Sequence, residues 1–347
     1  MIPLGIFLHA LGGWAAGSFY IPFKKVRNWA WESYWLVGGF FSWIIAPWVI
    51  AFVTVPSLIS VLRQAPPAGI LWCYVFGLLW GVGGLTFGLS MRYLGISLGF
   101  AIALGFCAAF GTVIPPIFTG KFGGLITHAS GLTTLAGVLV CLAGIALCGW
   151  AGIFKERELS EQQKKASVKE FNFAKGIWVA VFAGIMSACM AFGIAAGKPL
   201  AALAMEKGTT PLWRNSIVFI CVLAGGFTTN FIWCVFLNIK NRTTKDYLRS
   251  DAPRVANYFF SALAGVTWYM QFMFYGMGTT QMGKYDFSSW TIHMAFIIVF
   301  SNMWGLIFRE WKGTSRRTHQ VVLTGILVLI LSTLVVGFGN YLASLEK

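Results

Sequence analysis

Long apolar segments constrain the fold of this chain more than any other feature of its sequence. A helix needs about 20 mainly apolar residues to cross the hydrocarbon core of a bilayer. Ten such windows are present, at residues 4–22, 34–56, 69–91, 95–118, 131–152, 176–196, 213–239, 255–277, 288–308 and 319–342. A transmembrane barrel would instead show short segments of alternating polarity. The sequence therefore predicts an all-α integral membrane protein with ten transmembrane helices.

The charged residues agree with this prediction. They make up 11% of the 347 residues, whereas soluble domains carry about 25%. The net charge of +15 could indicate a nucleic-acid partner, but 19 of the 26 Lys and Arg residues lie in the loops after the first, third, fifth, seventh and ninth windows. Such a bias marks cytoplasmic loops. We therefore expect a lipid bilayer and no nucleic acid as partner, with both termini outside.

Cysteine and histidine usage argues against metal or enzyme chemistry. The seven cysteines all lie in apolar segments and form no CxxC pair, so we interpret them as packing residues. The four histidines are scattered and lie in no HExxH or GxSxG motif. The sequence predicts no metal site and no cofactor. A membrane enzyme needs a nucleophile, a base and an orienting group, so this class is not expected.

The second half of the chain repeats the spacing of the first. An offset of 188 residues superposes helices three to five on helices eight to ten. It matches Gly77 with Gly265, Trp80 with Trp268, Gly88 with Gly276, Gly95 with Gly283, Gly137 with Gly325 and Gly149 with Gly337. Helix one matches helix six at an offset of 171, through Gly5 with Gly176 and Gly13 with Gly184. We therefore divide the chain into repeats 1–154 and 176–347, with a cytoplasmic linker at 155–175.

The odd number of helices in each half determines the orientation of the repeats. Five spans return the chain to the opposite side, so the second repeat enters the membrane inverted. Inverted repeats build transporters in which a site near the midplane opens to either side. The alternative is an old duplication that serves only close helix packing through small residues.

Several segments carry a resemblance to a known family. They are YIPFKKVRNWAWESYW at 20–35, MRYLGISLG at 91–99, GKP at 197–199, WYMQFMFYGMG at 268–278 and YDFSSWTIHM at 285–294. In these segments the chain resembles the bacterial L-rhamnose–proton symporters of the drug/metabolite transporter superfamily. The resemblance implies proton-coupled uptake of L-rhamnose, or of a close deoxyhexose or hexose, across the bacterial inner membrane. Export of drugs or metabolites by the same fold is the alternative.

One departure from the family concerns helix three. The family carries amide side chains there, where this chain has Gly84 and Thr86. If those amides contact the sugar, the sugar preference of this chain differs.

Only two of the 11 acidic residues lie against the start of a span. These are Glu32, between Trp residues, and Asp286, before the ninth window. Both are candidate proton-coupling groups, and the alternatives are a dipole-compensating acid for Glu32 and an N-cap for Asp286. The other nine acids are interpreted as solvated surface, at Glu156, Glu158, Glu161, Glu170, Glu206, Asp246, Asp251, Glu310 and Glu346.

Neighbouring residues extend these candidates. Helical spacing places Trp290 and His293 on the face of Asp286, and His293 titrates near neutral pH, so it is either a proton site or a core imidazole. Lys198 is expected on the outer side with Asp286. Lys24 and Lys25 are expected on the inner side with Glu32. We interpret Asp286 with Lys198 and Glu32 with Lys25 as candidate gate pairs, against the alternative of ordinary interface charge.

A sugar site needs hydrogen-bonding groups and aromatic planes. Helix eight offers both, because Trp268, Gln271 and Tyr275 share one helical face. Further candidates for sugar binding are aromatic residues on other helices, namely Trp14, Trp80 and Trp290. Since the chain has 16 Trp, many of them must belong to the membrane-interface belt instead.

Overall fold

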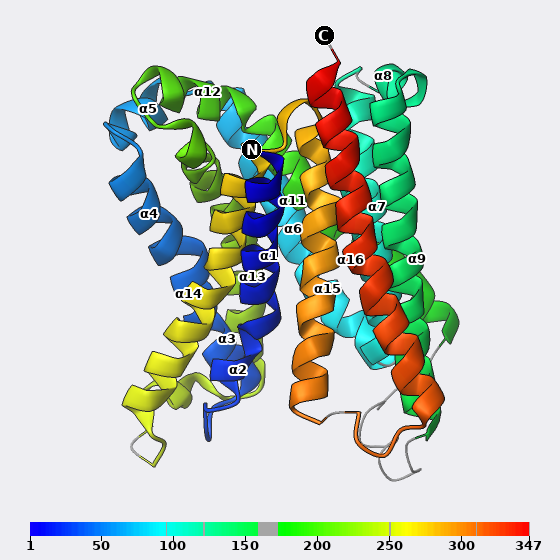
Figure 1. Cartoon of the computed structure of the whole chain (residues 1–347). Helices are drawn as coiled ribbons and strands as arrows, with labels where there is room; N and C mark the ends of the chain where they lie inside the picture. The colour runs from blue at the N-terminus through cyan, green and yellow to red at the C-terminus, as the bar shows by residue number, and fades with distance from the viewer. Residues whose placement is uncertain (95, 121, 159–172, 250, 310, 347) are drawn as a thin grey trace. The chain divides into compact units, whose positions relative to one another are not determined.

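A computed structural model describes residues 1–94, 96–120, 122–158, 173–249, 251–309 and 311–346, and these residues form helices and turns without a strand (Figure 1). The first half contains α1 (Ile2–Ser18), α2 (Tyr20–Phe23), α3 (Trp31–Phe40), the π-helix η1 (Phe41–Ile45), α4 (Ala46–Thr54), α5 (Leu58–Gln64), α6 (Pro67–Leu94), α7 (Ile96–Phe118), α8 (Phe122–Thr127) and α9 (Ala129–Glu158). The second half contains α11 (Phe173–Ala196), α12 (Lys198–Glu206), η2 (Pro211–Trp213), α13 (Ser216–Lys240), η3 (Thr244–Leu248), α14 (Arg254–Thr279), η4 (Gly283–Ser288), α15 (Ser289–Ile307) and α16 (Arg316–Leu345).

The chain forms a multi-pass membrane protein. In the described residues, each of the ten predicted windows lies mainly on a helix or on a run of consecutive helices. Within the described ranges, eight of these spans are long and apolar enough to cross a bilayer, and the remaining two windows lie on α7 and α14. In α14 polar side chains such as Asn257 and Gln271 interrupt the apolar sequence.

The chain divides into two compact units, and each takes helices from both halves of the sequence. Unit 1 consists of Met1–Trp14, Gly83–Ala191 and Gly278–Lys347, and unit 2 of Ala15–Val82 and Phe192–Met277. In unit 1, α7 and α9 from the first half pack against α15 and α16 from the second half. In unit 2, α3 and α4 lie with α13 and α14.

In unit 1 the long helices α9 and α16 pack along one another. Glycines make this close approach possible. A Cβ at Gly137 would lie 2.5 Å from Cγ2 of Val336, and a Cβ at Gly325 would lie 2.7 Å from Sγ of Cys148. Small residues at both contacts therefore bring the two backbones together.

The C-terminal end of each of these two helices also contacts the N-terminal end of the other. The carboxylate of Glu158, at the end of α9, accepts hydrogen bonds from the backbone N–H of Ser315 (2.6 Å) and from the hydroxyl of Thr318 (2.7 Å). The carboxylate of Glu346, just after α16, accepts from the hydroxyl of Ser130 (2.7 Å) at the start of α9. Both glutamates therefore supply acceptors to a helix N-terminus whose first N–H groups have no partner within the helix.

In unit 2 two glycines allow backbone-to-backbone crossings. A Cβ at Gly77 of α6 would overlap the carbonyl of Val222 on α13. A Cβ at Gly265 of α14 would overlap the carbonyl of Gly38 on α3. Any larger residue would force these helices apart.

The span from α3 to α4 contains a widened turn. Residues 41–45 form a π-helix directly before α4, which carries Pro47 in its first turn. Proline has no N–H to continue the α-helical pattern, and the widened turn is a single-turn π-bulge between two α-helices.

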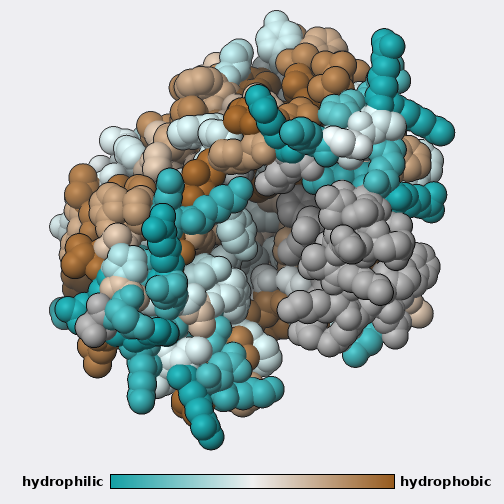
Figure 2. All heavy atoms as spheres, turned by 90° about the horizontal axis from the view of Figure 1, so that it is seen from below, coloured by the Kyte–Doolittle hydropathy of each residue, from teal (hydrophilic) through white to brown (hydrophobic). Residues whose placement is uncertain are grey.

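The ends of the helices carry the polar surface. In unit 1 the start of α1 and the end of α16 lie at the same end of the unit (Figure 1). Seen from below, hydrophilic side chains gather at the lower end, and apolar side chains lie along part of its edge (Figure 2). In unit 2 the segment after α2 contributes exposed Lys24, Lys25 and Arg27. This distribution is typical of a protein whose flanks face lipid.

Candidate functional site

Four of the predicted sugar-binding residues lie in unit 2. Trp268, Gln271 and Tyr275 belong to the continuous helix α14, so the predicted common face is retained. Trp80 of α6 and Trp268 both make edge-on contacts with Phe272, with ring centroids 5.5 Å and 6.2 Å apart. Two indole rings, one from α6 and one from α14, therefore meet at Phe272, next to the buried amide of Gln271.

The polar atoms of this region include donors that the described residues leave unused. Neither Nε2 of Gln271 nor Nε1 of Trp268 has a hydrogen-bond partner among the described residues, although both atoms are buried. Nε1 of Trp43 is in the same situation. Buried donors are normally paired, so these three positions are where a hydroxyl-rich ligand or water would be stabilised.

Trp43 and its neighbour Ser42 were not predicted. Both line a small cavity of unit 2 together with Phe19, Gly265 and Trp268. The π-turn at 41–45 contains both residues, and a sequence signal for such a turn is weak. The proline after it is the one available hint.

In unit 1 the structure brings Trp290 and His293 together, with ring centroids 6.4 Å apart. The indole N–H of Trp290 donates to the carbonyl of Cys107 on α7 (3.0 Å), and Gly111 leaves the space for the ring. A second histidine, His9 of α1, lies 6.2 Å from His293 between centroids. Sequence reasoning missed His9, because it stands alone in an apolar helix far from its partner in the chain.

Asp286 lies before α15 rather than in it. It belongs to the 3-10 helix η4, in which Tyr285 has non-helical backbone angles, and the N-cap position of α15 is Ser288. The interpretation of Asp286 as the N-cap is therefore wrong. The common face predicted for Asp286 with Trp290 and His293 stays a prediction, since the α-helix itself begins at Ser289.

The remaining single candidates lie at the surface. Trp14 is 46% exposed, which suits an aromatic residue at a lipid or interface position. Lys198 and Lys25 are exposed as well. The structure describes both Lys25 and Glu32, and they form no ion pair with each other.

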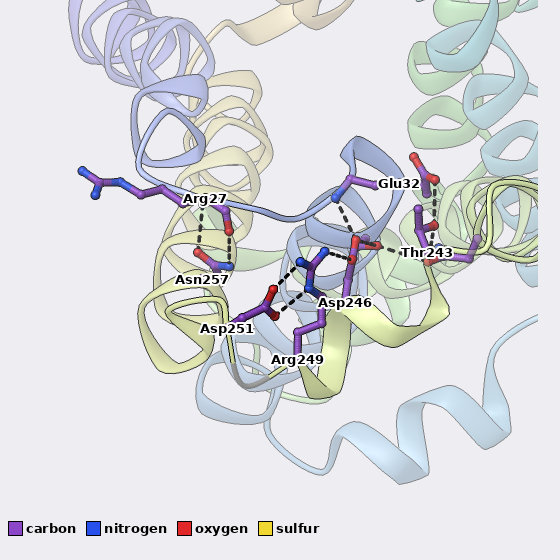
Figure 3. A network of polar contacts seen from close by, with 10 residues as sticks. Arg27, Glu32, Thr243, Asp246, Arg249, Asp251 and Asn257 are labelled. Carbon is purple, nitrogen blue, oxygen red and sulfur yellow. Dashed lines mark hydrogen bonds and ion pairs between the residues drawn. The ribbon is translucent and has the colours of Figure 1, made fainter.

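Glu32 is instead buried in a polar network of unit 2 (Figure 3). Its Oε1 accepts hydrogen bonds from the amide of Asn241 (3.0 Å) and from the hydroxyl of Thr243 (2.8 Å). These two residues follow the end of α13. Glu32 therefore connects the start of α3 to the end of α13 through two neutral donors.

Asp246 is a correction to the sequence analysis, which placed it on the solvated surface. It is 4% exposed, and its Oδ2 accepts from the backbone N–H of Ala30 (2.7 Å) and from the hydroxyl of Ser33 (2.8 Å). Ala30 is the N-cap residue of α3 and has no side-chain oxygen to serve it. Asp246 therefore caps α3 from a distant part of the chain.

Around this cap the loop is secured by two further contacts (Figure 3). Asn257 of α14 accepts from the backbone N–H of Arg27 (3.0 Å) and donates to its carbonyl (2.8 Å). The guanidinium of Arg249 donates to both oxygens of Asp251 (2.8 and 2.5 Å) and lowers the pKa of that exposed carboxyl. The segments 27–33 and 238–257 are thereby joined at several points.

Comparisons with known proteins identify the family of this chain. The family model described as L-rhamnose-proton symport protein matches residues 1–342. L-rhamnose-proton symporters from Cronobacter sakazakii and Pectobacterium carotovorum are 39% identical over 342 and 343 residues, and the one from Yersinia pestis is 37% identical over 342. Each match covers 97% of this chain and 98% of the relative. The chain belongs to the L-rhamnose-proton symport protein family.

Proposed function

We propose that this protein is a proton-coupled carrier that takes up L-rhamnose, or a close deoxyhexose or hexose, across the bacterial inner membrane by alternating access. Its family membership supports this function, as do relatives named L-rhamnose-proton symporters over nearly their whole length. In this proposal the chain is a transporter and not an enzyme. Sugar and proton are its transported partners.

The proposal includes ten transmembrane helices arranged as two inverted five-helix repeats, 1–154 and 176–347, with both termini outside. The linker 155–175 joins them, and its residues 159–172 lie outside the described part of the chain. Reciprocal contacts between equivalent residues support this arrangement. Such contacts are expected when a two-fold relation exchanges the two partners of an interface.

The first reciprocal set lies between α9 and α16. At the offset of 188, Gly137 corresponds to Gly325 and Cys148 to Val336. The contact of Gly137 with Val336 is therefore repeated, with the repeats exchanged, by the contact of Gly325 with Cys148. The same exchange relates the bond between Glu158 and Thr318 to the bond between Glu346 and Ser130.

Two further sets of glycine contacts are also repeated with the two halves of the chain exchanged. A Cβ at Gly5 would lie 2.9 Å from Sδ of Met282, and a Cβ at Gly176 would lie 2.5 Å from Cγ of Leu94. These pairs are related by the offsets 171 and 188. In unit 2, the equivalent glycines Gly77 and Gly265 each meet a backbone carbonyl of the other repeat. This reciprocity is the observation that best supports a two-sided carrier.

Within this carrier we assign the sugar to the aromatic and amide side chains. The unused donors of Gln271 and Trp268 support this assignment, because a sugar offers hydroxyl acceptors and C–H faces. The other assigned residues are Tyr275, Trp80, Trp14 and Trp290. The residues proposed for proton coupling or gating are Asp286, His293, Glu32, Lys198 and Lys25.

A measurement of sugar-driven proton movement tests the function. Addition of L-rhamnose to energy-depleted cells that express the protein should make the medium more alkaline, because each sugar enters with a proton. A panel of hexoses and deoxyhexoses identifies the preferred sugar. Cells without the protein are the control. No alkalinisation with any sugar, or proton movement only during export of preloaded compounds, would favour an exporter of the same fold.

A further inference from the structure

Two histidines lie next to each other in the interior of unit 1. His9 of α1 is 0% exposed and His293 of α15 is 1% exposed. Their ring centroids are 6.2 Å apart, with an interplanar angle of 60°. The two imidazoles therefore form a pair that is shielded from solvent.

Glycines on both sides of the pair create this geometry. A Cβ at Gly278 would lie 2.7 Å from Cε1 of His9, so only a glycine leaves space for the ring. One turn after His9, a Cβ at Gly13 would overlap Phe296 of α15. The two helices are thus in backbone contact directly beside the two histidines.

The surroundings of the pair supply little other charge. In α1 and α15 the two histidines are the only residues that can become charged near neutral pH, and α7 carries no acidic or basic residue. The thiols beside α15 are Cys107, next to Trp290, and Cys141, whose Sγ lies 3.9 Å from the carbonyl of Thr291. Three other elements that contact α15 carry further titratable residues. These are Lys284, Tyr285 and Asp286 in η4, Cys148, Lys155, Arg157 and Glu158 in α9, and Arg316, Arg317, His319 and Tyr341 in α16.

We propose that His9 and His293 together form the proton-binding site of the transporter and hold one proton between them. Histidine is the side chain whose charge changes near physiological pH. Buried ionisable residues in a transmembrane helix mark proton paths. This inference rests on the proposed proton-coupled function and assigns its proton to a specific pair of residues.

The distance between the rings determines the number of protons. Two positive charges about 6 Å apart repel each other, and at an effective dielectric constant of about 20 the second proton binds roughly 100-fold more weakly than the first. The pair therefore titrates as a unit. One proton should accompany each sugar, whereas two independent histidines would carry two.

The test compares matched substitutions in purified protein reconstituted into liposomes. His9→Gln and His293→Gln each remove the titratable group and keep a neutral hydrogen-bonding side chain. We expect both variants to exchange labelled L-rhamnose against unlabelled sugar, because exchange needs no net proton movement. Accumulation driven by a pH gradient should fall at least tenfold, to equilibration. His128→Gln, in an exposed histidine of the same unit, is the control and should accumulate sugar like the unaltered protein.

A stoichiometry measurement on the unaltered protein accompanies these variants, and it can overturn the inference even if neither variant folds. The sugar gradient that stops net flux at a fixed proton gradient gives the number of protons per sugar, and we expect one. A value of two, or full accumulation by either His9→Gln or His293→Gln, would overturn the inference. Absence of proton-coupled transport in the unaltered protein would instead contradict the proposed function itself.

Discussion

At the scale of single residues, buried polar groups distinguish this chain from a plain bundle of apolar helices. Asp246 is the clearest case, because it serves the N-terminus of α3 from a loop more than 200 positions later in the sequence. Its position could not be predicted, since the surrounding segment KNRTTKDYLR reads as solvated. Burial of a loop acid depends on which helix end it meets in the folded protein.

Removal of this distant cap should destabilise the protein. Asp246→Ala would leave the part-buried N–H of Ala30 without its acceptor and would remove the nearer of the two acceptors of the Ser33 hydroxyl. A buried donor that loses its partner costs about 1–3 kcal/mol. We expect a lower midpoint of thermal unfolding in detergent, whereas Asp251→Ala, which removes an exposed acid, should change the midpoint little. Equal midpoints for both variants would show that Asp246 contributes no more than a surface charge.

Gln271 offers a test of the sugar site at the same scale. If its amide donates to a sugar hydroxyl, Gln271→Leu leaves that hydroxyl unpaired in a dry site and weakens binding by about 1–3 kcal/mol. This corresponds to roughly a 5- to 150-fold lower affinity, measured by tryptophan fluorescence or by sugar exchange. The control is Gln64→Leu, in an exposed glutamine of α5. Unchanged affinity in a folded Gln271→Leu variant would assign Gln271 to packing.

At the scale of helices, the sequence was informative because lipid sets the length of a span. All ten windows fall on helices, even where α14 is interrupted by polar residues. The details at the ends were less predictable. The π-turn before Pro47 and the 3-10 helix that holds Asp286 depend on local backbone geometry. For the same reason the interpretation of Asp286 as the N-cap of α15 was wrong.

The glycine contacts between α9 and α16 predict a strong dependence on side-chain size. Gly137→Ala would place a methyl group 2.5 Å from Val336, and overpacking of this kind costs about 1–3 kcal/mol. Gly88→Ala is the matched control, because a Cβ there meets nothing within 4 Å and alanine favours a helix. Thermal unfolding in detergent compares the two variants. Equal stability would mean that α9 and α16 separate at no cost.

The glutamate at the end of α16 predicts a dependence of stability on pH. Hydrogen bonds from Ser130, and then the charges of His128 and Lys284, lower the pKa of Glu346 from its ordinary value of 4.5. The stabilisation is therefore fully present above that ordinary value and is lost as the pH falls through the lowered pKa of the folded state. Unfolding midpoints from pH 7 down to pH 3 should decline less steeply for Glu346→Gln than for the unaltered protein. Parallel curves would exclude a contribution of Glu346 to the acid sensitivity.

At the scale of the whole molecule, proton coupling sets a limit on accumulation. One proton that enters down about 100 mV releases roughly 2.3 kcal/mol. At about 1.36 kcal/mol per tenfold, this supports a sugar gradient of roughly fifty-fold without any pH gradient. A protonophore should reduce the gradient to equilibration. Accumulation that survives the protonophore and requires sodium would contradict proton coupling.

The proposed repeat is the whole-molecule feature for which the sequence carried the clearest signal. A constant offset between glycines was visible because close helix crossings tolerate few other residues. The histidine pair gave no such signal, since the two residues are 284 positions apart and only the packing of α1 against α15 brings them together. Pairings of this kind follow from the tertiary structure and not from a local pattern.

The two glutamates that end α9 and α16 make the lengths of these helices interdependent. Each carboxylate reaches the first turn of the opposite helix only because both helices have 30 residues. One inserted turn lengthens a helix by about 5.4 Å, so an insertion in either helix alone would separate one glutamate from its partners. A change of membrane thickness therefore has to be met by both helices at once. The length of α9 and the length of α16 are therefore matched to each other through the two glutamate contacts.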